Sequence, residues 1–168
     1  YSGYENTEII QSNYGLRPKA WKWDKIGNVV ELAYGKGLKH ADRIPGDFPV
    51  YGSSGVIGSH ETYLVEGPTI IVGRKGNVGS VYWSYENCYP IDTVFYVKSK
   101  LSFYYVYFNF QHQNFIDSDA AVPGLSRRQA YGLPMLIPSQ DILTIFENYI
   151  EPIFKQLRVL KETNDKLR

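Results

Sequence analysis

The stretch of sequence that most constrains the fold runs from residue 67 to residue 96. Ile70-Ile71-Val72 is a short apolar run between residues that break secondary structure, and such a run is typical of a strand inside a sheet. It is followed by Gly73-Arg74-Lys75-Gly76-Asn77-Val78-Gly79, whose glycines allow backbone angles that other residues avoid. Residues 81–88 and 89–96 continue as a second strand, a corner and a third strand. The stretch therefore predicts strands joined by a glycine-rich turn that presents the donors Arg74, Lys75 and Asn77.

The rest of the pattern predicts an α+β fold. Short strands separated by glycine turns predict a curved, mixed but mostly antiparallel sheet from residues 48–98 and 133–137. Within this region we expect strands at 56–58 and at 62–65. The spacing of aromatic residues predicts a flanking helix over 102–117, with Ser102 as its N-cap. A short helix or strand is expected near 24–33.

The C-terminal residues predict a long helix with an apolar seam. Apolar residues recur there at steps of three and four, as in a coiled coil, at Ile142, Phe146, Tyr149, Ile153, Leu157, Leu160 and Leu167, with Asn164 interrupting the series. Pro152 lacks a backbone N–H, so we expect it to break or kink the helix after a short helix at 139–150. We accordingly predict two units, a domain over residues 1–138 and a helical segment over 139–168. No helix of comparable length is predicted elsewhere, so we expect Ile153, Leu157, Leu160, Asn164 and Leu167 to pair with another helix.

Composition narrows the classes of function. The 168 residues carry a net charge of +1, so no overall field attracts a polyanion. Charge is uneven, however, because residues 17–43 hold seven Lys and Arg against three Asp and Glu. The single cysteine, Cys88, rules out an internal disulfide and fits a reducing compartment. No signal peptide or membrane-spanning run is visible. We expect the chain to be a piece of a longer protein, because it starts at Tyr1 and stops inside a helical pattern.

Patterns for catalysis and metal binding are weak. The glycine spacing of residues 73–79 matches neither the dinucleotide fingerprint nor the phosphate loop, and no helix is predicted after it. No Glu-x-Lys or Asp-x-Lys triplet of a metal-dependent nuclease occurs. His40, His60 and His112 have no second ligand at metal spacing, so we expect no metal site. We expect Asp92 to cap a turn and Cys88 to be a core residue rather than a nucleophile.

Several of these stretches resemble the specificity subunit of type I restriction–modification enzymes. The resemblance rests on the glycine-rich turn, on Tyr89-Pro90-Ile91-Asp92-Thr93-Val94-Phe95-Tyr96, on the later strand, proline and seamed helix, and on the lead-in at residues 4–9 and 18–27. Two departures are visible: Ser139-Gln140-Asp141-Ile142 stands where the family often has Pro-Leu-x-Glu-Gln, and this chain holds one recognition domain where the family usually has two.

The resemblance implies a non-catalytic, cytoplasmic protein of a prokaryote that reads one half of a split sequence in double-stranded DNA. It implies partner subunits as well: modification subunits that methylate adenine with S-adenosylmethionine, and restriction–translocase subunits that use ATP and Mg²⁺. The chain itself is expected to bind no cofactor. Its long helix is expected to pair with a second copy or with the helix of a second recognition domain.

Four loops carry side chains suited to DNA. Arg and Lys pair with guanine, Asn pairs with adenine, and Lys and backbone N–H groups hold phosphates. The candidate DNA-binding residues are Lys36, Lys39, Arg43, Ser53, Ser54, Arg74, Lys75, Asn77, Ser126, Arg127 and Arg128. Two alternatives stay open. One is a protein-interaction module that assembles through the C-terminal helix, and the other is an enzyme domain that binds a phosphorylated small molecule at the glycine-rich turn.

Overall fold

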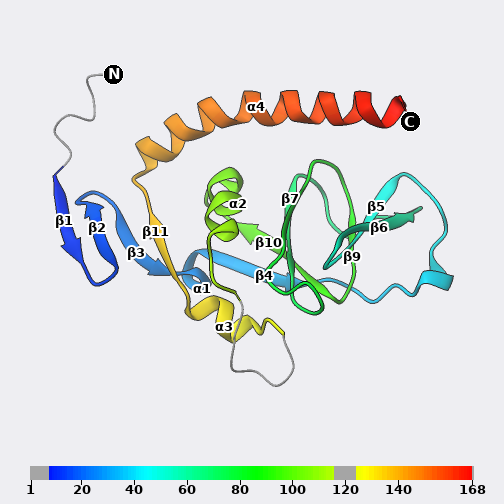
Figure 1. Cartoon of the computed structure of the whole chain (residues 1–168), viewed down its shortest axis with the longest axis horizontal. Helices are drawn as coiled ribbons and strands as arrows, with labels where there is room; N and C mark the ends of the chain where they lie inside the picture. Colours follow the sequence, from blue (N-terminus) through cyan, green and yellow to red (C-terminus); the bar gives the residue numbers. More distant parts are fainter. Residues whose placement is uncertain (1–7, 116–123, 168) are drawn as a thin grey trace.

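The computed structural model describes residues 8–115 and 124–167 and confirms the α+β class (Figure 1). The strands are β1 Ile9–Ser12, β2 Gly15–Pro18, β3 Lys22–Lys25, β4 Val30–Tyr34, β5 Phe48–Gly52, β6 Gly55–His60, β7 Thr69–Gly73, β8 Val81–Ser84, β9 Tyr89–Pro90, β10 Val94–Ser99 and β11 Pro134–Ile137. The helices are α1 Ile26–Val29, the 3-10 helix η1 His40–Asp42, α2 Phe103–Gln111, α3 Arg127–Gly132 and α4 Gln140–Lys166. Figure 1 shows α4 along one side of the domain and α3 on the opposite side.

A four-stranded antiparallel sheet in the order β4-β10-β7-β8 forms the centre of the domain. All five residues of β7 are buried, because neighbouring strands flank it and side chains cover both of its faces. Phe95 of β10 lies opposite Val72 of β7, and both are fully buried. The apolar run at 70–72 is therefore a central strand, as predicted.

The strands predicted to form a single sheet are instead divided among three sheets, and β1 and β2 form a fourth. The strand expected at 133–137 exists as β11, but it pairs with β3 near the N-terminus rather than with the central sheet. The β5–β6 hairpin turns at residues 52–55, as expected, and β5 also pairs in parallel with β9. The strand expected at 62–65 is wrong, because only Val65 forms an isolated bridge, with Cys88.

Helix α2 packs on the central sheet and begins where the sequence predicts. The Ser102 hydroxyl accepts a hydrogen bond from the Tyr105 N–H, which satisfies a donor of the first turn. Val106 and Phe110 bury one face of the helix in the main core. The helix ends at Gln111 rather than at residue 117, and the chain turns so that Phe115 packs against Phe110 with ring centroids 5.3 Å apart. Residues 116 and 117 lie outside the described residues.

Helix α4 is one continuous helix, so the predicted break at Pro152 is wrong. The physical reason lies two residues further on, where the buried Phe154 packs its ring among Trp83, Tyr104 and Tyr107. A proline inside a helix removes one hydrogen bond, and this packing offsets that loss. The division into a domain over residues 1–138 and a helical segment over 139–168 stays a prediction. Because α4 is continuous through Pro152, no break in this helix separates the two units. Within the described residues, no helix combines the length and apolar character needed to cross a membrane.

Candidate nucleic-acid interface

The glycine-rich turn between β7 and β8 is folded tightly back on itself. The Gly73 N–H donates to the Ser80 carbonyl at 2.8 Å, and the Gly79 N–H donates to the Gly73 carbonyl at 2.9 Å. Gly76 and Gly79 both have φ of +77°, in the left-handed region that favours glycine. A Cβ on Gly73 would collide with the Asn77 carbonyl oxygen and the Ser80 Oγ. The sequence therefore needs its glycines here to bring residues 74–77 to the surface in one fixed shape.

Ser53, in the β5–β6 turn, holds the glycine-rich turn in place. Its carbonyl accepts hydrogen bonds from the Ser80 Oγ at 2.7 Å and from the Tyr82 hydroxyl at 3.2 Å. Its hydroxyl accepts a weaker bond from the Asn77 N–H at 3.4 Å. Ser54 lies beside it and is exposed. Two of the four predicted loops are thus brought together.

The loop leading into α3 joins the same surface. The Leu125 N–H donates to the Arg74 carbonyl at 2.9 Å, and Lys75 forms a β-bridge with Gly124. These contacts set Arg127 and Arg128, at the start of α3, beside the glycine-rich turn.

Tyr34, at the end of β4, lies within cation–π distance of two of these cations. The Arg127 Cζ is 4.1 Å from the centroid of the Tyr34 ring, and the Arg74 Cζ is 5.0 Å from the same centroid. The Arg74 Nη1 donates to the Asp92 carbonyl at 2.8 Å. Sequence reasoning missed Tyr34, because an aromatic residue at a strand end carries no local signal for such a contact.

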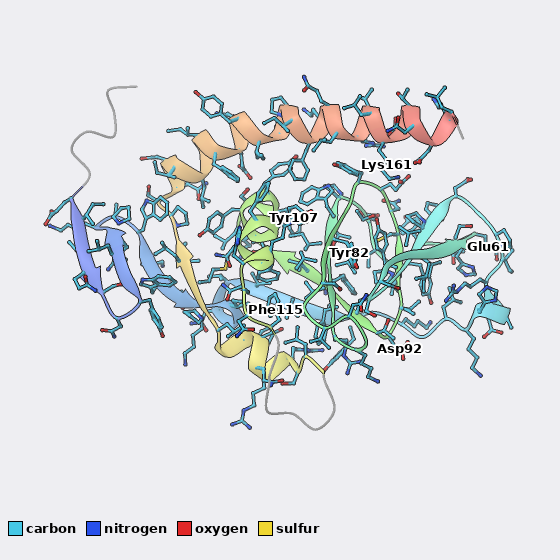
Figure 2. The ribbon with its side chains drawn as sticks, viewed as in Figure 1. Glu61, Tyr82, Asp92, Tyr107, Phe115 and Lys161 are labelled. Carbon is cyan, nitrogen blue, oxygen red and sulfur yellow. The ribbon has the colours of Figure 1, made fainter. Side chains whose placement is uncertain are left out.

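We call the set formed by Lys36, Arg74, Lys75, Arg127, Arg128, Ser53, Ser54 and Asn77 the basic surface. Lys36 is included because its backbone N–H donates to the Pro90 carbonyl, which sets the backbone of this exposed residue close to Asp92. None of its five cations takes part in an ion pair with another described residue. Figure 2 shows Asp92, whose carbonyl binds Arg74, on the side of the domain away from Lys161 of α4. The basic surface and α4 therefore face in different directions.

Three of the predicted DNA-binding residues lie outside the basic surface, and two of them have other local roles. The Arg43 Nη1 donates to the Ile57 carbonyl at 2.9 Å, so this side chain ties the η1 segment to β6. Lys39 is exposed at the start of η1, and Figure 1 shows η1 at the end of the molecule, well away from α3. The Ser126 hydroxyl caps α3 by accepting from the Gln129 N–H at 3.1 Å. DNA contact by Lys39, Arg43 and Ser126 stays a prediction, and the structure does not group the first two with Arg74.

The predicted helix-pairing residues lie on an uncovered face of α4. Ile153 is 49%, Leu157 47% and Leu160 59% exposed, and Asn164 and Leu167 are exposed as well. Phe154 and Leu143 are instead the residues of α4 that are buried against the domain. They lie eleven residues apart, just over three full turns, and so share a second face that the seam pattern did not reveal.

Cys88 is fully buried, and burial raises the pKa of its thiol to about 11. A protonated, inaccessible thiol is a poor nucleophile at neutral pH, which agrees with the expected core role.

Comparisons with known proteins place this geometry in a family. The family model of the type I restriction modification DNA specificity domain matches residues 18–130, more than half of the chain. A search of curated protein sequences gives no significant match.

Solved structures share the fold at low sequence identity. The S subunit of a type I restriction-modification system from M. genitalium matches with a TM-score of 0.73 and 14% identity over 96% of this chain and 43% of that one. The HsdS subunit from Thermoanaerobacter tengcongensis matches with a TM-score of 0.61 and 13% identity over 88% of this chain and 40% of that one. A structure concerning complex assembly and conformational transition of the type I R-M system matches with a TM-score of 0.65 and 13% identity, over 88% and 41%. The chain thus spans less than half the length of these proteins, and it belongs to the family of type I restriction modification DNA specificity domains.

Proposed function

We propose that this chain reads one half of a bipartite sequence in double-stranded DNA as part of a type I restriction–modification complex. The observation that carries the proposal is the basic surface, which groups Arg74, Lys75, Arg127 and Arg128 without acidic partners among the described residues. Unneutralised cations on a rigid surface attract the phosphate backbone, while Asn and Arg side chains beside them reach base edges. Family membership supports DNA, rather than a small phosphorylated molecule, as the polyanion.

In this proposal the chain itself carries out no catalysis. Adenine methylation with S-adenosylmethionine belongs to modification subunits, and ATP- and Mg²⁺-dependent steps belong to restriction subunits. The exposed seam of α4 supports assembly, because an apolar helix face of this length is unfavourable in water. We assign to it pairing with another long helix, from a second copy of the chain or from a second recognition domain. The position of α4 away from the basic surface leaves room for both contacts at once (Figure 1).

A pair of charge-reversal variants tests the DNA contact. We expect Arg74→Glu with Lys75→Glu to abolish sequence-specific binding by the assembled complex, since each lost contact costs about 1–3 kcal/mol. Lys75→Glu with Arg128→Glu is the second variant, because both side chains are exposed and their replacement leaves the packing intact.

The matched control is Lys19→Glu with Lys22→Glu, which makes the same change in net charge at the end of the molecule that carries β1 and β2 (Figure 1). Binding is measured by gel shift with genomic and random duplexes at two salt concentrations, and folding by circular dichroism. If both basic-surface variants fold normally and bind with wild-type affinity, the proposal is wrong.

A further inference from the structure

The paired guanidinium groups of Arg74 and Arg127 point to a specific part of the DNA. The Cζ atoms of Arg127 and Arg74 lie 4.1 Å and 5.0 Å from the centroid of the Tyr34 ring. Tyr34 is 49% exposed, and its ring packs at 5.0 Å, centroid to centroid, against the buried ring of Phe95. Each cation gains from the negative face of the ring, and the two cations repel each other. No ion pair with another described residue relieves that repulsion. An anion bound to both guanidinium groups would offset this repulsion.

The free hydrogen-bond donors favour a phosphate over a base. Arg reads guanine by presenting two N–H groups side by side to O6 and N7. In Arg74, the Nη1 already donates to the Asp92 carbonyl, and the Nε is buried without a partner among the described residues. The Nη2 of Arg74 is left without a hydrogen bond to a described residue, and it suffices for a single charge-assisted bond to a phosphate oxygen. Arg127 also has its Nε buried without a partner among the described residues, and its two terminal nitrogens are the atoms that can reach a ligand.

The backbone around the pair is fixed before any ligand arrives. The Arg74 N–H donates to the Thr93 carbonyl at 3.0 Å, and the Gly35 N–H, next to Tyr34, donates to the Val94 carbonyl at 3.2 Å. The Leu125 N–H to Arg74 carbonyl bond ties in the segment that leads to Arg127. A fixed backbone suits a contact that positions the duplex, which is the role of phosphate contacts.

We infer that Arg74 and Arg127, held together by Tyr34, form a clamp for one DNA backbone phosphate that positions the duplex and carries no sequence information. This inference rests on the proposed function. In it, Tyr34 is a positioning residue that acts through the two arginines.

The clamp predicts a distinctive pattern in binding measurements on the assembled complex. A duplex selected from a random pool and a scrambled duplex of equal length are compared over a series of salt concentrations. We expect Arg127→Gln to weaken binding of both duplexes by the same factor, about tenfold, and to lower the slope of log affinity against log salt by about 1. The ratio of the two affinities should stay at the wild-type value. Arg127→Lys should recover most of the loss, because a phosphate accepts a point charge.

Variants of Tyr34 separate the clamp from simple folding effects. Tyr34→Phe keeps the ring and should bind both duplexes as the wild type does. Tyr34→Leu removes it and should weaken both equally, while the circular dichroism spectrum stays that of the folded protein. The control Lys22→Gln, an exposed cation on β3, should leave the salt slope unchanged.

Three results would overturn the clamp. If Arg127→Gln weakens binding of the selected duplex alone, Arg127 reads a base. If it changes the binding of neither duplex, Arg127 does not contact DNA. Neither result contradicts the proposed function. The third result concerns the wild-type complex. If it prefers no duplex and its binding does not depend on salt, both the clamp and the proposed function are wrong.

Discussion

Phe154 anchors α4 to the rest of the domain, and removing its ring should cost a large part of the stability. The side chain is 6% exposed, and its ring centroid lies 4.8 Å from that of Trp83 and 4.9 Å from that of Tyr104. Replacing a core Phe by Ala costs about 3–5 kcal/mol, out of a typical total of about 5–15 kcal/mol. We expect Phe154→Ala to lower the free energy of unfolding by about 3–5 kcal/mol. A broken helix at Pro152, as the sequence predicted, would make the same change nearly silent.

Ile153 provides the matched control, because it is the preceding residue of the same helix and is half exposed. Ile153→Ala should change the free energy of unfolding by no more than about 0.5 kcal/mol. Urea titrations followed by circular dichroism measure both variants, at protein concentrations where light scattering reports a monomer. A loss below about 1 kcal/mol for Phe154→Ala, or equal losses for the two variants, would refute the docking of α4 through this ring.

Three further predictions follow from the fold. Gly73→Ala should destabilise the domain by more than about 1 kcal/mol, because the added Cβ collides with the glycine-rich turn. Gly132→Ala has open space around the added Cβ and should be neutral or slightly stabilising, and urea titration compares the two variants. Because burial raises the pKa of Cys88 from 9.0 to about 11, the folded state keeps a proton that the unfolded state loses. The stability contribution of Cys88 should therefore be complete below pH 9 and disappear as the pH rises through 11, and thiol-reagent labelling at pH 8 should require unfolding. Leu157→Glu with Leu160→Glu should abolish self-association or helix pairing, which light scattering at several concentrations measures. The circular dichroism spectrum should stay that of the folded protein. A wild-type chain that is monomeric at every concentration and in the assembled complex would contradict the pairing.

The local parts of the fold could be predicted from the sequence. Ile70-Ile71-Val72 is apolar because the strand is buried on both faces, and its glycine neighbours mark the turn that follows. Ser102 caps α2 through a contact within one turn of chain. In each case the pattern and its cause lie within a few residues of each other.

The parts that depend on long-range contacts could not be predicted. The pairing of β11 with β3 joins segments more than one hundred residues apart, and no local pattern specifies it. Tyr34 matters because β4, the glycine-rich turn and α3 meet there, which is a property of the topology. Phe154 lies one position from the seam residue Ile153, about 100° around the helix. From Ile153 onward the seam pattern therefore described the uncovered face of α4, whereas its earlier member Phe146 packs against Phe108 of α2. The pattern missed the face that is docked through Phe154.

Sequence-selective DNA binding is the central claim, and selection from a random pool of duplexes tests it most directly. The assembled complex is incubated with the pool at two salt concentrations, and the bound duplexes are sequenced after several rounds. We predict that one short, fixed half-site emerges at both salt concentrations, and that Lys75→Glu with Arg128→Glu prevents its enrichment. Bound sequences that stay random, with folded and assembled protein, would contradict the account.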